Sequence, residues 1–304
     1  MILGKLREKI KRYAALTTGD FETIFENFRV PSLPDIVVKL LTLLRDPEAS
    51  APEVASLLSY DPGLASQILQ MVNSAHIGLR SPVSNLSQAV NILGLKQIET
   101  LVVSYGVTKI VKDPKRPGFD LSAFWTDSLF RALFSHQLGK KFGREDETFL
   151  GALLQDIALP VLLTEWYDAY QKAYLVAQEE KVRLSEAETK ILNWHHAQAG
   201  AWLAKKWHLS EVIICAIGLH ISAPEELSKL PLEDEVFPIV AASAALPSVL
   251  EEEPSWKPWE TFLDAGFFSV KEAKEAFSQA REHLLETAKN FGLKVREPLN
   301  PPNL

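Results

Sequence analysis

The sequence predicts an all-helical protein. From Pro31 onward, apolar residues recur at helical spacing, helix starts carry capping residues, and strand-like alternation does not persist for more than a few residues. A length of 304 residues fits one large or two ordinary domains, and 47% hydrophobic with 23% charged residues is a globular composition. We therefore expect a multi-helical bundle preceded by a smaller helical subdomain.

Helix-start signals define the elements of the first half. Apolar residues predict a helix over Ile36–Leu44. Ser50 and Glu53 stand three apart, so that each side chain can satisfy a free backbone donor at the start of the next helix. Asp61 followed by Pro62 predicts a third helix, because aspartate is a good cap and proline suits the first helical position.

A glycine and a loop divide the rest of the first half. Gly94 is a natural left-handed stop, after which a longer apolar helix is expected over 95–111. Lys112–Asp120 collects two prolines, a glycine and several charges, so we place the junction between two subdomains there.

Helical periodicity continues through the second half. Helices are expected over 124–142, 147–163, 166–180, 185–207 and 270–291, with Pro160 closing the second of these and 247–259 forming a linker. The expected parts are an amphipathic segment 1–30, a helical half 31–112, a second helical half 121–246, and a linker with helix 247–304.

Charge and cysteine content restrict the cellular compartment and the kinds of partner that we expect. A net charge of −7 repels a nucleic-acid backbone at long range, and the single cysteine, Cys215, cannot form an intramolecular disulfide. The N-terminus lacks the apolar core of a leader, and no segment approaches 18 consecutive apolar residues. We expect a cytoplasmic protein without a transmembrane segment that does not bind nucleic acid.

The first half strongly resembles the opening of an HDOD domain, from Pro31 to about Val103 without a gap. The resemblance rests on Leu33-Pro34, the helix at 53–58, Tyr60-Asp61-Pro62-Gly63-Leu64, Val72-Asn73-Ser74-Ala75 and 89–94. It implies a helical fold related to the HD phosphohydrolases, with an HD-like bundle in the second half. The stretch 150–157 resembles the one in which HD enzymes carry their His-Asp pair.

The resemblance assigns five positions to the remnant of the HD metal site. They are Asp127, Gln155, Asp156, His196 and His220. Gln155 replaces the histidine of the His-Asp pair, and Asp127 replaces a histidine that many relatives carry. The last aspartate of the superfamily should fall near Ser243 or Ala244, neither of which is acidic.

This residue set argues against a two-metal hydrolytic centre, because imidazoles and carboxylates must converge from several helices to hold two ions. Asp156, His196 and His220 remain good ligands, whereas Gln155 offers only a neutral amide oxygen. One divalent transition metal ion is the alternative, with Asp127 as a further ligand. We expect no metal and no catalytic residue, and a hydrogen-bonded remnant between helices. His195 either joins His196 or faces away from it.

The family resemblance implies a bacterial regulatory module whose output is protein interaction. We therefore expect a free-standing, non-catalytic signalling protein with protein partners. The alternative is a metal-dependent phosphohydrolase or phosphodiesterase acting on a nucleotide or phosphate ester. A third reading keeps a nucleotide pocket in the degenerate cleft without hydrolysing the ligand.

Overall fold

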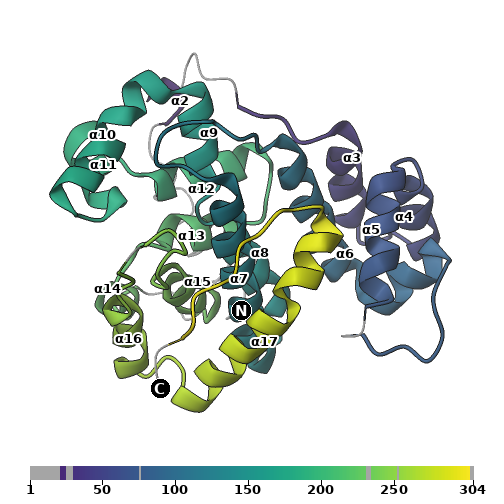
Figure 1. The fold of residues 1–304 in the computed structure, drawn as a ribbon. Coiled ribbons are helices and arrows are strands. Elements are labelled where there is room, and N and C mark those ends of the chain that lie inside the picture. Colours follow the sequence, from purple (N-terminus) through teal and green to yellow (C-terminus); the bar gives the residue numbers. More distant parts are fainter. Residues whose placement is uncertain (1–20, 25–29, 75–76, 231–233, 252, 302–304) are drawn as a thin grey trace. The chain divides into compact units, whose positions relative to one another are not determined.

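The computed structural model describes residues 21–24, 30–74, 77–230, 234–251 and 253–301. Every regular element in these ranges is a helix, as the sequence predicts (Figure 1). The expected amphipathic segment 1–30 lies outside the described residues, apart from α2 (Phe21–Ile24) and Val30. The end of the C-terminal tail, 302–304, lies outside them as well.

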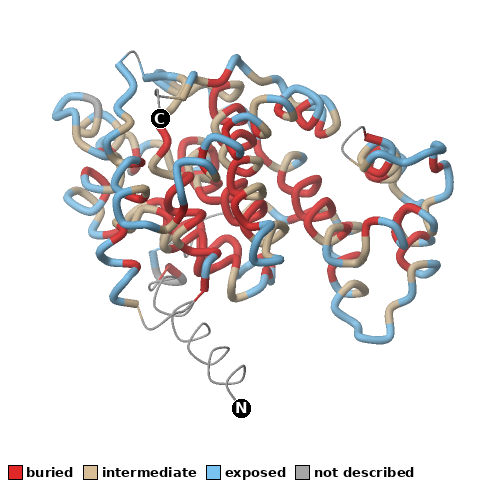
Figure 2. The backbone as a smooth tube through the Cα atoms, turned by 90° about the horizontal axis from the view of Figure 1, so that it is seen from below, coloured by how far each residue is buried: buried red, intermediate tan, exposed pale blue. Residues whose placement is uncertain are grey.

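The chain folds into two compact units. The smaller comprises residues 31–111 and 286–293, and the larger comprises 1–30, 112–285 and 294–304. Within each unit, the buried residues follow the inward sides of the helices (Figure 2).

The smaller unit is built on one long helix that three short helices contact. The helices are α3 (Asp35–Leu44), α4 (Ala51–Leu58), α5 (Pro62–Val72) and α6 (Leu86–Ile110). The expected caps are confirmed: Ser50 and Glu53 form a capping box, and Asp61 accepts the N–H of Leu64. Gly94 has φ 78° and kinks α6, because a residue without a Cβ adopts this backbone freely.

The larger unit packs α7 and α8 together with α12, α13 and α15. Its helices are α7 (Leu121–Gly139), 3-10 helix η1 (Lys140–Phe142), α8 (Glu145–Leu154), α9 (Ala158–Glu165), α10 (Tyr167–Glu180), α11 (Leu184–Leu192), α12 (His196–Lys206), α13 (Glu211–Leu219), α14 (Pro224–Leu227), α15 (Val236–Ala244) and α16 (Lys257–Asp264), together with the first part of α17 (Val270–Phe291).

Two helices that the sequence predicts as continuous are broken in the structure. The expected helix 147–163 is split into α8 and α9, and the expected helix 185–207 into α11 and α12. The prediction that Pro160 ends a helix was wrong. Pro160 lies in the first turn of α9, where a missing backbone N–H costs no hydrogen bond. The predicted linker is also shorter, because α16 already begins at Lys257.

One stretch of the described residues, Glu145–Glu165, is long and apolar enough by composition to cross a membrane. It covers both α8 and α9, and 78% of its apolar window is buried inside the protein. A core helix of a soluble protein meets the same criterion, so that this stretch is weak evidence for membrane insertion.

Aromatic side chains fix α16 and α17 against α7. The ring of Phe134 on α7 lies 6.4 Å from the ring of Trp259 and 4.8 Å from that of Phe277, between centroids. All three side chains are buried, with Trp259 fully so. This contact holds the C-terminal part of the larger unit over the helix that carries Asp127.

Candidate functional site

Both helix breaks bring side chains to one buried point. Gln155 and Asp156 lie in the short turn between α8 and α9. His196 is the first residue of α12, directly after a break in which Asn193 has φ 62°. His220 follows the last residue of α13. Side chains at helix ends can converge on one point from three directions.

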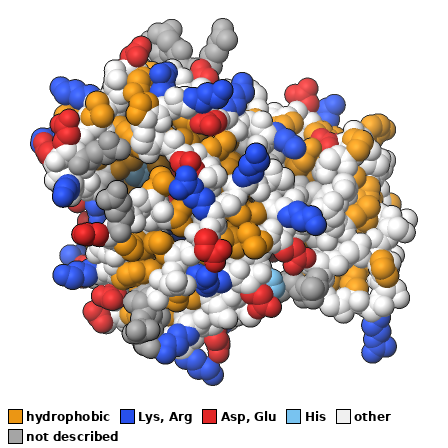
Figure 3. Space-filling model, viewed as in Figure 1, with side chains coloured by type: hydrophobic (Ala, Val, Ile, Leu, Met, Phe, Trp, Pro, Cys, Tyr) orange, Lys and Arg blue, Asp and Glu red, His pale blue; other side chains and the backbone are white. Residues whose placement is uncertain are grey.

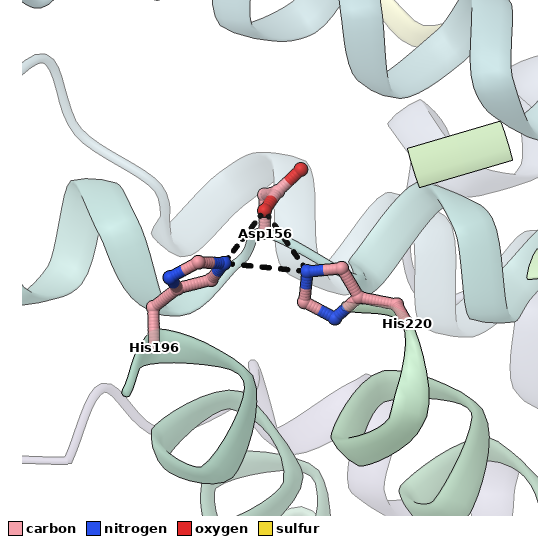
Figure 4. Close-up of side chains that lie close together, drawn as sticks. All are labelled: Asp156, His196 and His220. Atoms are coloured by element: carbon pink, nitrogen blue, oxygen red, sulfur yellow. Dashed lines mark hydrogen bonds and ion pairs between the residues drawn. The ribbon is translucent and has the colours of Figure 1, made fainter. Parts of the chain in front are cut away.

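Asp156, His196 and His220 form a triangle of polar atoms (Figure 4). Nε2 of His196 and Nε2 of His220 are 3.3 Å apart, and Oδ1 of Asp156 lies 3.3 Å and 3.4 Å from them. The side chains of His196 and His220 are 7% and 2% exposed, and that of Asp156 is 16% exposed. The three sequence-predicted positions therefore meet in the interior of the larger unit.

The outer nitrogen of each imidazole is held by an acceptor. Nδ1 of His196 lies 2.7 Å from Oε2 of Glu188, which also accepts the backbone N–H of His196 at 2.9 Å. Nδ1 of His220 lies 2.7 Å from the carbonyl oxygen of Ile217, which can only accept a hydrogen bond. These partners orient both rings so that the Nε2 atoms face Asp156.

Glu188 is a site residue that the sequence reasoning missed. Its side chain is fully buried on α11, and Tyr170 of α10 donates a short hydrogen bond to it. Burial and the adjacent Glu188 raise the pKa of Tyr170 well above its usual value, so that the phenol keeps its proton. The only sequence signal for this role is that Glu188 lies eight residues before His196. The helix break between them, which lets the two side chains meet, is not revealed by the apolar periodicity.

Arg131 is the second residue that sequence reasoning missed. Its guanidinium lies on α7, donates from Nη1 to Oδ2 of Asp156 at 2.9 Å, and donates from Nη2 to the carbonyl oxygen of Leu246 at 2.9 Å. The side chain is 12% exposed. Arg131 thus binds the oxygen of Asp156 that does not face the histidines.

The two other predicted positions are engaged elsewhere. Gln155 is buried, donates from Nε2 to Oδ2 of Asp156 at 3.2 Å, and accepts from the hydroxyl of Ser243 at 3.3 Å. Asp127 accepts from the hydroxyl of Ser248 at 2.5 Å and from the N–H of Val249 at 3.1 Å. Burial raises the pKa of Asp127, although Arg131 and both hydrogen bonds act in the opposite direction. The structure therefore brings Gln155, but not Asp127, to the triangle.

The cluster stabilises its own charges. Burial acts to raise the pKa of Asp156, but the hydrogen bond from His196, the adjacent His220 and the charge of Arg131 hold it well below its usual value. Burial acts to lower the pKa of His196, but Glu188 and Asp156 raise it to about 10. At neutral pH, the anion of Asp156 therefore faces protonated His196, and the guanidinium of Arg131 lies beside its other oxygen.

His195 faces away from the cluster. Its ring accepts the N–H of Gln198 and caps α12, while the side chain lines an open cleft of about 870 Å³ between α11, α12 and the turn after α13. Burial is the main cause that lowers the pKa of His195 to about 4, so the ring is neutral at physiological pH. Arg183 and Lys190 line this cleft together with Glu186 and Glu226. Basic and acidic side chains are likewise interspersed on the face drawn in Figure 3.

Sequence comparison relates the chain to a family and to one curated protein. A family model described as the HDOD domain matches residues 30–223. An uncharacterized protein of Treponema pallidum (strain Nichols) is 25% identical over 209 residues, which are 66% of this chain and 40% of that protein. The chain therefore spans less than half the length of this relative.

Solved structures share the fold. An HDOD domain protein from Geobacter sulfurreducens is 22% identical and superimposes with a TM-score of 0.63, covering 93% of this chain and 98% of its own. A candidate signal transduction protein from Marinobacter aquaeolei VT8 is 16% identical, with a TM-score of 0.65, covering 95% and 66%. A candidate phosphohydrolase from Shewanella amazonensis SB2B is 21% identical, with a TM-score of 0.58, covering 88% and 86%.

Proposed function

The chain belongs to the HDOD family, and from this premise we propose that it is a cytoplasmic, non-catalytic signal-transduction module that works by binding other proteins. The description of the Marinobacter relative as a signal transduction protein supports this assignment. The remnant HD site then has a structural role: it joins α7, α12, α13 and the turn before α9.

The observation that carries this proposal is the charge balance around Asp156. The carboxylates of Asp156, which is 16% exposed, and of Glu188, which is buried, are matched by the guanidinium of Arg131 and the imidazolium of His196. In an HD hydrolase, divalent cations provide this positive charge. Here the protein's own side chains provide it, and a metal ion would first have to displace the proton of His196.

The closure of the cluster also supports a non-catalytic role. A hydrolytic metal keeps an open coordination position for water and substrate. The side chains of His196 and His220 are nearly inaccessible, and Gln155 and Arg131 bond the remaining oxygen of Asp156. A phosphate ester would need these groups to move before it could reach the triangle.

A metal-dependent phosphohydrolase or phosphodiesterase is the second candidate, and the geometry of the triangle favours it. Three ligands of a tetrahedral ion at about 2.1 Å lie about 3.4 Å apart, which matches the separations of 3.3 to 3.4 Å in the triangle. The outer nitrogens of both rings are held by Glu188 and by the carbonyl of Ile217, as is usual for metal-binding histidines. Asp156, His196 and His220 would hold the ion, which would activate water.

Elemental analysis of the purified protein separates the two candidates. We expect less than about 0.1 transition metal ion per chain after dialysis against Zn²⁺, Mn²⁺ or Fe²⁺, and equal values in the His196→Ala/His220→Ala variant. We also expect no hydrolysis of bis(p-nitrophenyl) phosphate above that of the Asp156→Asn variant. About one ion per chain that is lost in the double variant, together with hydrolysis that requires Asp156, would replace our proposal with the second candidate.

A further inference from the structure

The C-terminal residues 294–301 lie across α7 without regular secondary structure. Their backbone is held by side chains of the larger unit. The N–H of Arg296 donates to Oγ1 of Thr126 at 2.7 Å. Nη1 of Arg281 on α17 donates to the carbonyl oxygens of Pro298 and Leu299 at 3.2 Å and 3.0 Å. These bonds use only backbone atoms of the segment, so any extended chain could form them.

Three side chains of this segment, those of Arg296, Glu297 and Pro298, provide sequence-dependent contacts, and Glu297 accepts from Nη2 of Arg281 at 3.0 Å. The guanidinium of Arg296 pairs with Asp120 at 2.7 Å and donates to the hydroxyl of Ser122 at 3.1 Å. Pro298 is buried, whereas its neighbours from Lys294 to Pro301 are intermediate or exposed. The segment therefore contributes one cation and one apolar anchor, two residues apart.

We call the surface under this segment the tail groove. Its polar residues are Asp120, Ser122, Thr126 and Arg281, and its apolar wall is formed by Phe130, Leu246 and Trp256. A void of about 10 Å³ remains between this wall and the side chains of Pro298 and Leu299. The groove thus has the parts of a peptide-binding surface: donors and acceptors for a backbone, an acidic pocket and an apolar wall.

The contacts of the tail are suited to exchange. The Arg296–Asp120 pair is 47% and 37% exposed, and the Glu297 side chain that pairs with Arg281 is 79% exposed. Exposed ion pairs contribute little because water and salt screen them. The tether to α17 also gives the segment a high effective concentration at the groove.

We propose that the tail groove docks an extended segment of a partner protein that carries arginine, any residue, proline and leucine in succession, and that residues 294–301 occupy it until the partner displaces them. This inference rests on the proposed protein-binding function and names the partner's chemistry. Asp120 selects the arginine, the wall around Trp256 receives the Pro-Leu pair, and Arg281 and Thr126 bind the backbone.

Fluorescence anisotropy of a labelled peptide with the sequence of residues 294–301, added to the full-length protein, tests the groove. The double variant Arg296→Ala/Pro298→Asp releases the tail without changing any residue of the groove. We expect it to bind the peptide at least tenfold more tightly than the wild type does. A peptide with alanine in place of its arginine serves as the matched control and should bind the released variant about two- to fivefold more weakly, the range expected for an exposed ion pair.

Adding Arg281→Gln to the released variant should reduce the gain, since the peptide then loses the guanidinium that donates to two of its carbonyl oxygens and to Glu297. Circular dichroism checks that each variant folds. If the double variant does not fold, the single variant Arg296→Ala takes its place, with a smaller expected gain in peptide binding. Equal peptide binding by the wild type and the released variant, or binding that ignores the peptide's arginine, would overturn the proposal. Metal content and hydrolysis, measured on the same preparations, report separately on the non-catalytic function.

Discussion

The guanidinium of Arg131 and the carboxylate of Asp156 form a mostly buried ion pair with an N···O distance of 2.9 Å. The two residues lie on α7 and in the turn between α8 and α9, and the side chains are 12% and 16% exposed. This pair places a fixed positive charge beside the aspartate that an HD hydrolase would use to bind metal. It connects the stability of the larger unit to the state of the remnant site.

Replacing Arg131 with alanine should destabilise the larger unit by about 3 to 5 kcal/mol, because Asp156 would keep its charge in the interior without this partner. Urea unfolding followed by tryptophan fluorescence measures this, since all seven tryptophans lie in the larger unit. Lys141→Ala removes the more exposed pair with Glu272 and should change stability by less than about 1 kcal/mol. Equal losses in the two variants would contradict the buried charge balance.

His196 should remain protonated well above neutral pH. Its folded pKa of about 10 exceeds the ordinary histidine value of 6.5, so the stabilisation is fully present below about pH 6.5 and is lost as pH rises through 10. A titration by ¹⁵N-histidine NMR measures the pKa directly. Glu188→Gln removes the largest cause that raises this pKa and should lower it by several pH units. A wild-type pKa near 6.5 would refute the assigned imidazolium.

Gly200→Ala should destabilise the larger unit by about 1 to 3 kcal/mol, because the new Cβ would lie 2.9 Å from Cγ2 of Ile217. The contact joins α12, which begins with His196, to α13, which His220 directly follows. Ile217→Ala removes the clashing methyl group, so the double variant should lose less stability than the sum of the single variants. If the losses of stability in the two single variants simply add up in the double variant, the new Cβ does not clash with Ile217 and the prediction is wrong.

The smaller unit offers an independent test. Tyr105 on α6 donates to Oδ1 of Asp61 at 3.0 Å, the same oxygen that caps α5. Tyr105→Phe should cost about 1 kcal/mol and accelerate hydrogen exchange of the α5 amides, measured by mass spectrometry. Tyr60→Phe is the control, because Tyr60 is 77% exposed and should leave that exchange unchanged. Unaltered exchange in both variants would mean that the hydroxyl contributes nothing to the cap.

The sequence alone determined the helical class, the caps at Ser50 and Asp61, the left-handed backbone of Gly94 and the family, although it predicted a helix end at Gly94 where α6 is only kinked. These features depend on residues within one or two helical turns, where spacing fixes which groups can meet. It also selected Asp156, His196 and His220, which the structure brings together. It did not locate the breaks before α9 and α12, because the apolar periodicity continues across them.

Only the tertiary structure decided the chemical state of the site. Arg131 reaches Asp156 from 25 residues away, and Asp127 turns to Ser248 across 121 residues. Local propensity does not encode such contacts, since they depend on how separate helices pack and on which charges that packing buries together. The same ligands could form a metal centre or a self-neutralised ion cluster, and the neighbours that the fold brings to Asp156 and His196 distinguish the two.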